Sequence, residues 1–193
     1  MTLHYDGEVK IAKINMGPYD NNGYIVICPD TNEGIIIDTP AEPEKLINEV
    51  GDVQIKAILI THKHQDHLLG FAEITGAIGA PVAVHANDVD GLPRAPETVL
   101  NDGDTILSAT CKPRPFTPPA ILREPLATCP EALQQILNSV SGKLLTLPDE
   151  VAVYAGHGAV DTTIGEARRR YQVFTSKSHS PDLCGDIDWL ETE

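Results

Sequence analysis

Residues 61–67 read Thr-His-Lys-His-Gln-Asp-His and follow directly on the apolar run 57–60. A strand that ends in such a turn projects its ligands from a rigid edge, and neutral imidazoles with one carboxylate suit zinc, iron or manganese. The alternative is a chance cluster in a polar loop, although the whole chain of 193 residues holds only seven histidines. The segment therefore indicates a fold that carries a strand into a metal site.

The spacing within this motif favours two ions. His62 and His64 are two residues apart, so on an extended turn they point the same way and can share one ion. Asp66 and His67 are adjacent and are directed toward a second ion. Two neighbouring ions can hold a bridging water, lower its pKa and polarise a carbonyl or phosphoryl oxygen. The motif thus predicts hydrolytic chemistry without a protein nucleophile.

The His-x-His-x-Asp-His pattern resembles the metallo-β-lactamase fold superfamily, and other segments extend the resemblance. Residues 34–40 are similar to the family strand that ends in a buried aspartate, here Asp38. Residues 151–158 are similar to its late strand and ligand-bearing Gly-His-Gly turn. Residues 144–149 and 161–166 resemble the glyoxalase II-like (hydroxyacylglutathione hydrolase-like) branch. The likeness covers residues 9–107 and about 131–170.

The resemblance implies an α+β fold, the αββα sandwich, with one or two strands of the second sheet absent. We expect a single domain over residues 1–175 and a loose acidic tail over residues 176–193. It also implies that two zinc ions are bound, or fewer in this chain, with iron or manganese as alternatives.

The ligand set is also implied by the resemblance. His62 and His64 would bind the first ion, and Asp66, His67 and His157 the second. Asp38 would hold the ligand loop in place; a turn-capping aspartate is the alternative. His157 lies between two glycines, and the alternative there is a tight turn with an incidental histidine. His85 follows a strand and is expected to be no ligand.

By the same resemblance, a metal-bound hydroxide would hydrolyse a thioester or ester, such as an acyl-glutathione, with Asp66 as a catalytic residue that orients it. The helical extension of glyoxalase II is not recognisable after Arg170, which favours a small ester, thioester or lactone. An iron-dependent persulfide dioxygenase would use the same motif. The rival from another class is a catalytically impaired or inert remnant with partial metal binding.

Residues 108–130 depart from the family pattern. Six of the 15 prolines lie within residues 111–130, so neither a strand nor a helix is expected there. The family places a third ligand histidine for the first ion in this region, within a Thr-Pro-Gly-His-Thr-Pro-Gly-like motif, and a bridging aspartate further on. Neither is recognisable, and two protein ligands are too few for the usual three plus water.

A shifted reading frame would explain why the family motif is missing from residues 108–130. Back-translation of residues 114–124 with permitted codons, read one frame over, can spell Ala-Ile-His-Thr-Pro-Gly-His-Thr-Pro-Gly. We therefore hypothesise that the segment is translated out of frame, with a natural proline-rich loop as the alternative. The bases of codons 108–130 decide between them, because the motif appears only if the third bases spell it.

Composition limits the partners. The net charge of −14, from 28 acidic and 14 basic residues, disfavours nucleic acid. No apolar run of 18 residues is present and the N-terminus lacks signal-peptide features, so we expect no membrane contact and a cytoplasmic protein. Cys28, Cys111, Cys129 and Cys184 are expected to be isolated thiols. The partner is a small-molecule substrate, and the oligomeric state stays open.

Periodicity and turn residues predict alternating strands and helices. The expected strands are residues 9–16, 23–28, 34–37, 56–60, 81–85, 105–107 and 151–155. The expected helices are residues 43–50, 67–78, 131–140 and 163–171. Alternation of this kind indicates sheets that are covered by helices.

Overall fold

The structure is a computed structural model that describes residues 3–7, 9–101, 104, 137–158 and 162–179. The chain divides into two compact units, which are described separately. The first comprises Met1–Pro119 with Gly156–Ala159, and the second comprises Ala120–Ala155 with Val160–Glu193. The single domain expected over residues 1–175 stays a prediction.

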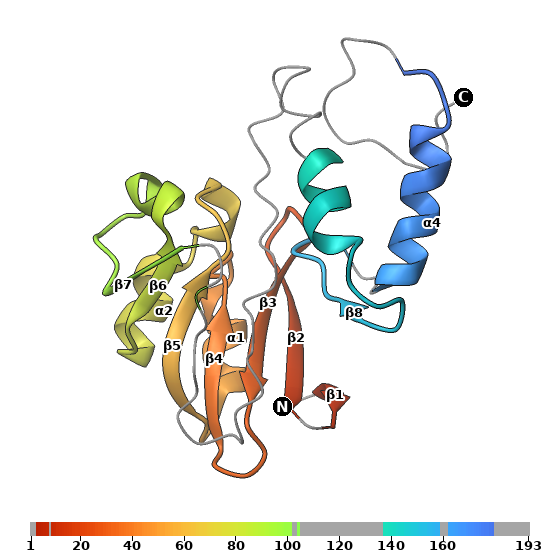
Figure 1. Cartoon of the computed structure of the whole chain (residues 1–193). Coiled ribbons are helices and arrows are strands. Elements are labelled where there is room, and N and C mark those ends of the chain that lie inside the picture. The colour runs from red at the N-terminus through yellow and green to blue at the C-terminus, as the bar shows by residue number, and fades with distance from the viewer. Residues whose placement is uncertain (1–2, 8, 102–103, 105–136, 159–161, 180–193) are drawn as a thin grey trace. The chain divides into compact units, whose positions relative to one another are not determined.

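The first unit is built on one mixed sheet of seven strands in the order β1-β2-β3-β4-β5-β6-β7 (Figure 1). Its strands are β1 (Leu3–Asp6), β2 (Lys10–Met16), β3 (Asn21–Ile27), β4 (Glu33–Ile37), β5 (Gln54–Ile60), β6 (Val82–His85) and β7 (Thr98–Leu100). Strands β1 to β4 pair antiparallel, whereas β4 to β7 pair parallel. The change at β4 follows from the connections, because a short turn joins antiparallel strands and a helix joins parallel ones.

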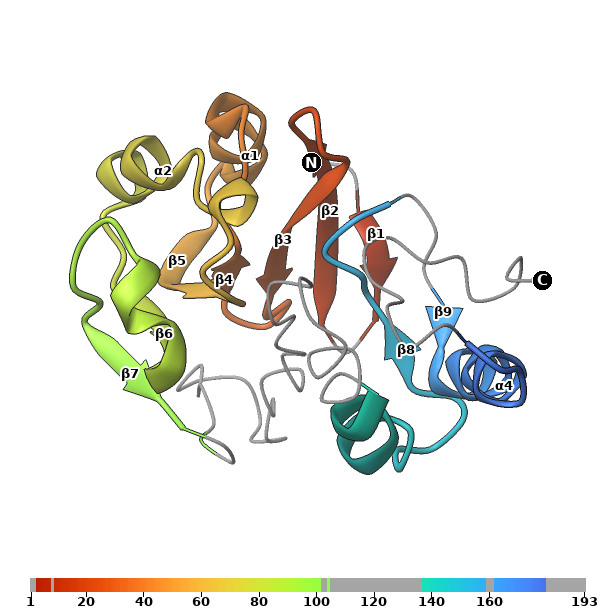
Figure 2. The ribbon, with the colours of Figure 1, turned by 90° about the horizontal axis from the view of Figure 1, so that it is seen from above.

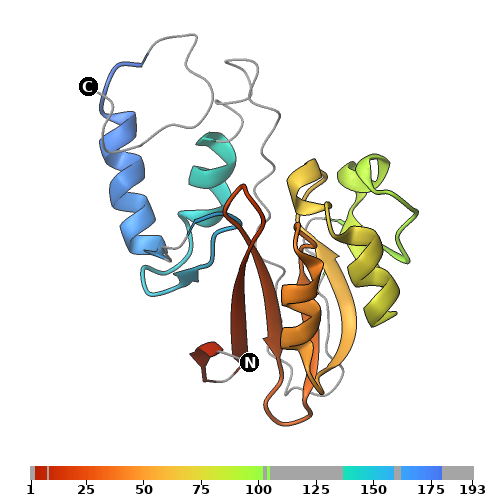
Figure 3. The same cartoon turned by 180° about the vertical axis from the view of Figure 1, so that it is seen from behind.

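Helices α1 (Pro43–Val50) and α2 (Phe71–Ile78) make the first two parallel connections. Both lie on the same face of the sheet, as the view from above shows (Figure 2). In the view from the back of the molecule they lie in front of the sheet (Figure 3). Leu46 of α1 and Phe71 and Ile74 of α2 pack against Ile36 and Ile58 of the central strands. The opposite face of these strands is also buried, at Ile35, Ile37 and Leu59 among others. Burial on both faces explains why β4 and β5 are apolar along most of their length.

Five predicted strands, over residues 9–16, 23–28, 34–37, 56–60 and 81–85, and the helix predicted over residues 43–50 are confirmed within two residues at each end, whereas the edge strands β1 and β7 were not predicted. The helix expected over residues 67–78 begins only at Phe71, after a separate 3₁₀ turn, η1 (Gln65–His67). Gly70 is the physical reason, because its main chain passes so close to the Pro40 carbonyl that a Cβ would lie 2.3 Å from that oxygen. The Gly70 N–H donates to the Thr39 carbonyl at 2.9 Å, which fixes the break.

The described part of the second unit contains a π-helical turn η3 (Val140–Leu144), two short strands β8 (Ala152–Val153) and β9 (Thr162–Thr163), and helix α4 (Ile164–Thr175). β8 and β9 pair antiparallel. The strand predicted over residues 151–155 is therefore shorter than expected, and the helix predicted over residues 163–171 runs four residues further. Thr163 caps α4, because its hydroxyl accepts a hydrogen bond from the Glu166 N–H at 3.3 Å.

Several expectations fall outside the described residues: the segment 108–130 with its shifted frame, the strand 105–107, most of the helix 131–140, and residues 180–193 of the tail. One expectation is wrong: Cys28 is disulfide-bonded rather than an isolated thiol, and the other three cysteines lie outside the described residues. Within the described residues, no helix is long and apolar enough to cross a membrane.

Candidate metal centre

The 61–67 motif leaves β5 at the carboxyl end of the parallel strands. Residues 61–64 have no regular secondary structure, and η1 then turns Asp66 and His67 back toward the sheet. The His67 N–H donates to the His64 carbonyl at 3.1 Å, which closes the turn. His67 becomes one of the largest fully buried side chains of the chain, whereas Asp66 stays partly exposed.

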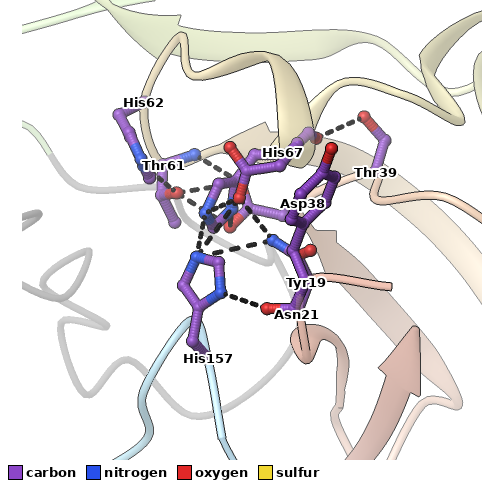
Figure 4. Close-up of polar contacts among 9 residues, drawn as sticks. Tyr19, Asn21, Asp38, Thr39, Thr61, His62, His67 and His157 are labelled. Atoms are coloured by element: carbon purple, nitrogen blue, oxygen red, sulfur yellow. Dashed lines mark hydrogen bonds and ion pairs between the residues drawn. The ribbon is translucent and has the colours of Figure 1, made fainter. Parts of the chain in front are cut away.

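Asp38 orients the His67 imidazole. Its Oδ2 lies 2.9 Å from His67 Nδ1, and its Oδ1 accepts a hydrogen bond of 2.8 Å from the Thr61 N–H (Figure 4). A carboxylate can only accept, so Nδ1 of His67 carries the proton and Nε2 presents a lone pair. Asp38 adopts a φ of 62°, a left-handed conformation that Asp tolerates better than most residues.

Thr39 fixes the main chain of the same histidine. Its N–H and its hydroxyl both donate to the His67 carbonyl, at 3.1 and 3.0 Å. Thr39 has no sequence signal of its own beyond its place in the Gly-Ile-Ile-Ile-Asp-Thr-Pro segment that contains Asp38. Together, Asp38 and Thr39 hold both the ring and the backbone of His67.

His157 reaches the motif from a turn between two glycines. Its Nδ1 lies 2.9 Å from the Tyr19 carbonyl oxygen, which can only accept, so this ring also carries its proton on Nδ1. Gly158 has a φ of 83°, which favours glycine. A Cβ on Gly156 would lie 3.1 Å from His67 Cε1, so glycine lets this turn approach the His67 ring. His157 and His67 thus meet although 90 positions separate them.

Three ligand atoms converge at this point. Nε2 of His67 and Nε2 of His157 lie 3.0 Å apart, and Asp66 Oδ2 lies 3.4 Å from the first and 3.3 Å from the second (Figure 4). Among the described residues, these three side chains form the one group of three that could hold a metal ion. Tetrahedral zinc at about 2.0–2.2 Å from its ligands separates them by roughly 3.3 Å, so the residues fit such an ion. With both protons on Nδ1, the Nε2 atoms of His67 and His157 face each other at 3.0 Å with no hydrogen between them, so their lone pairs repel. A bound cation would remove this repulsion.

Asn21, at the start of β3, contacts two of these ligands. Its Nδ2 donates to Asp66 Oδ2 at 2.7 Å and lies 3.5 Å from His157 Nε2. Burial is the largest single influence on the pKa of Asp66 and raises it, but the hydrogen bond from Asn21 lowers it, and the net result is a pKa below its ordinary value. Asp66 is therefore an anion at neutral pH, as a metal ligand must be.

His62 and His64 lie beside this group without joining it. The His62 ring centroid is 4.5 Å from that of His64 and 4.2 Å from that of His67. Burial, with a smaller contribution from His67, lowers the pKa of His62 to about 4, so its imidazole is neutral at pH 7. The two rings are thus adjacent, as the spacing predicts, and a third ligand for them does not occur among the described residues.

His85 is engaged elsewhere. Its Nδ1 accepts a hydrogen bond of 3.3 Å from the Asn87 N–H at the start of the 3₁₀ turn η2 (Ala86–Gly91). It is not part of the group of three described residues that could hold a metal ion.

An open hollow of about 460 Å³ adjoins the motif. Its lining consists of Lys63, Gln65, Leu68, Leu69, Gly91 and Pro93. Lys63 lies between His62 and His64 in the sequence, and its ammonium pairs with Asp90 at 2.7 Å. The hollow therefore has an apolar wall and a polar rim next to the ligands.

Known proteins of similar sequence and structure bear on this site. The hydroxyacylglutathione hydrolase of Methylobacterium sp. (strain 4-46) is 27% identical over 164 residues, which is 73% of this chain and 64% of that protein. The chain thus spans slightly less than two thirds of that relative's length. Among solved structures, ETHE1 from Myxococcus xanthus superposes with a TM-score of 0.68 at 21% identity, and the match covers 87% of this chain and 85% of that one. BLEG-1 B3 metallo-beta-lactamase gives a TM-score of 0.66 at 20% identity, over 82% of this chain and 96% of its own.

The structural likenesses, at these identities, show the αββα fold that the resemblance implied. The sequence model of the metallo-beta-lactamase superfamily matches residues 16–124, which is more than half of the chain and includes the complete 61–67 motif. The chain therefore belongs to the metallo-β-lactamase superfamily.

Proposed function

We propose that this protein is a metal-dependent hydrolase of thioesters or esters. The observation that carries the proposal is the triangle of Asp66 Oδ2, His67 Nε2 and His157 Nε2, whose edges of 3.0, 3.3 and 3.4 Å match the ligand spacing of a tetrahedral ion. Zinc suits two imidazoles and a carboxylate, and iron or manganese are alternatives. When bound there, such an ion supplies a Lewis acid that activates water and polarises a carbonyl oxygen.

The protein side chains divide the remaining work. His67 and His157 present neutral Nε2 atoms, because Asp38 and the Tyr19 carbonyl keep their protons on Nδ1. Asp66 is held as an anion by its hydrogen bond from Asn21 and can accept a hydrogen bond from an attacking water, which would orient it toward the substrate carbonyl. His62 and His64 are proposed as ligands of a further ion.

The substrate class rests on the relatives and the hollow. The relative in Methylobacterium is named as a hydroxyacylglutathione hydrolase, so an acyl thioester is the first substrate to test. The hollow beside Lys63 and Leu69 is open and partly apolar, and its volume of about 460 Å³ admits a small acyl group rather than a macromolecule.

A second candidate is an impaired relative that binds one ion and turns over slowly or not at all. The observation in its favour is that the described residues supply three ligands to one ion, whereas His62 and His64 form a pair. A site with two protein ligands holds its ion less well than one with three.

Reconstitution with zinc and assay against short acyl thioesters and aryl esters tests the proposal. We expect metal-dependent hydrolysis that falls at least about 100-fold in His157→Ala and persists in His85→Ala, a histidine outside the cluster. A metal-loaded wild type without activity would favour the impaired relative. Equal activity in wild type and His157→Ala would refute the proposed site.

A further inference from the structure

Asp20 and the first residues of β3 are hydrogen-bonded to the turn that carries His157. The Asn22 N–H donates to the Gly156 carbonyl at 2.7 Å, and the Gly158 N–H donates to the Asp20 carbonyl at 2.9 Å. Between these two bonds, Asn21 and His157 form an isolated antiparallel β-bridge. The turn is therefore paired as a short strand against residues 20–22, independently of any metal.

Two buried amide side chains reinforce this pairing. Asn22 Nδ2 donates to the Gly158 carbonyl at 2.7 Å, and Asn21 Nδ2 donates to Asp66 Oδ2 at the same distance. Both side chains are almost completely buried, with exposures of 1% for Asn21 and 0% for Asn22. Burying an amide is unfavourable unless its polar atoms are bonded, so these contacts account for asparagine at both positions.

The orientation of the Asn21 amide is informative. With Nδ2 toward Asp66, its Oδ1 is buried and has no hydrogen-bond partner among the described residues. Such an atom costs about 1–3 kcal/mol, so the contact with Asp66 must offset it. The reverse orientation would bring the amide oxygen against a carboxylate oxygen. The amide is thus held in place for its contact with Asp66.

We propose that Asn21 and Asn22 are positioning residues that set the Asp66–His157 spacing before an ion enters. Asn22 fixes the turn that carries His157. Asn21 links the carboxylate of Asp66 to the imidazole of His157, and Figure 4 shows Asn21 beside that imidazole. A carboxylate oxygen has a second lone pair, so the Asn21 bond leaves Oδ2 able to face a cation. This inference rests on the proposed metal site but concerns its metal-free state as well.

Two readouts test the roles separately. In the metal-free protein, amide hydrogen exchange measures how firmly residues 20–22 hold the His157 turn. Asn22→Ala should accelerate exchange at the Gly158 amide at least about tenfold, because the turn opens more often. Zinc affinity, measured by competition with a chromophoric chelator, tests the ligand spacing. Asn21→Ala and the similarly sized Asn21→Leu should both bind zinc about 10–100-fold more weakly and shift the visible spectrum of the cobalt-substituted protein.

Asn32→Gly is the matched control. Asn32 lies in the turn at the other end of β3, its φ of 56° suits glycine, and its side chain donates to the Asp52 carbonyl, which is not part of the metal-competent group. Its loss should leave both readouts unchanged. Zinc affinities within about twofold of wild type in folded Asn21 variants would overturn the inference while the proposed function stands. If wild type bound no zinc, the proposed function would be refuted, and exchange at the Gly158 amide alone would test whether Asn22 fixes the His157 turn. Unchanged exchange in Asn22→Ala would then overturn that role.

Discussion

His67 Nδ1 lies 2.9 Å from Asp38 Oδ2, and both side chains are only 2% exposed. A buried carboxylate facing a buried imidazole leaves one arrangement of the proton in the neutral ring, with Nδ1 as the donor and Nε2 unprotonated. This relationship gives His67 the tautomer and the fixed ring orientation that a metal ligand needs, because the carboxylate increases the basicity of Nε2 and prevents rotation of the ring.

Asp38→Asn should weaken zinc binding about 10–100-fold, because the neutral amide replaces the carboxylate that orients His67. Asparagine keeps the volume and tolerates the φ of 62°, so the fold should persist. Chelator competition measures the affinity, and circular dichroism checks the fold. Asp90→Asn is the control, since it breaks the exposed ion pair with Lys63, and Asp90 is not part of the metal-competent group. Equal losses in both variants would contradict the specific role of Asp38.

The His62 ring should remain neutral far below the usual range. In the metal-free protein its pKa is about 4, against about 6.5 in the unfolded chain, because burial disfavours the cation. Between these values the unfolded chain binds the proton more tightly, so this group lowers the free energy of unfolding as pH falls from about 6.5 to about 4. NMR titration of the ring measures the midpoint, and a value near 6.5 would refute the burial.

His62→Asn gives the matching stability measurement. The variant removes the titrating ring, so its free energy of unfolding in urea should fall less steeply than that of wild type between about pH 6.5 and about pH 4. Identical slopes for the two proteins would show that His62 does not carry this pH dependence.

Gly156→Ala should reduce zinc affinity several-fold without unfolding the protein. The added Cβ would lie 3.1 Å from His67 Cε1, so either the ring or the turn must move by a few tenths of an ångström. Such a shift disturbs a ligand set that requires near-ideal distances. Gly76→Ala within α2 is the control: its Cβ meets nothing within 4 Å and should stabilise the helix by about 0.5–1 kcal/mol. Unchanged zinc affinity in Gly156→Ala would show that a Cβ fits at this position without displacing His67 or His157, which would contradict the prediction.

Arg168 stabilises the second unit. Its guanidinium donates to the Leu145 carbonyl at 2.7 and 3.1 Å, to the Leu147 carbonyl at 2.8 Å, and pairs with Asp149. Arg168→Met should lower the free energy of unfolding by about 1.5–3 kcal/mol, because charge-assisted bonds to main-chain carbonyls are lost. Arg170→Met, which removes only an exposed pair with Glu166, should cost less than about 1 kcal/mol in urea unfolding. A smaller loss in Arg168→Met than in Arg170→Met would contradict this assignment.

Most strands of the first unit and helix α1 could be predicted, because their apolar runs and turn residues are local signals, whereas the short edge strands β1 and β7 were missed. Helix α1 occupies residues 43–50 as predicted, and the turn at residues 29–32 joins β3 to β4. The break before α2 could not be read from periodicity, since it depends on the contact of Gly70 with Pro40, which only the folded chain provides.

The grouping of Asp66, His67 and His157 was predictable from the sequence, whereas most of the residues that contact them were not. Their role as metal ligands stays a prediction. The histidine motif and the Gly-His-Gly turn carry recognisable patterns, and the contact of Asp38 with His67 follows the resemblance. The supporting contacts join segments that are distant in the sequence, and they come from Asn21, Thr39 and the carbonyl of Tyr19. Tyr19 contributes through its main chain alone. A main-chain acceptor leaves no mark on residue identity, so no pattern could have revealed it.

The ratio of zinc to protein, measured by elemental analysis after loosely bound ions are removed, is the direct test of the claim that Asp66, His67 and His157 bind a metal ion. We expect at least one zinc per wild-type chain, retention of that ion in His85→Ala and its loss in His157→Ala, because these three residues form the metal-competent group. A ratio close to two would mean that a further residue completes the site of His62 and His64. A wild type that retains no zinc, or a His157→Ala variant that retains as much as wild type, would contradict the claim.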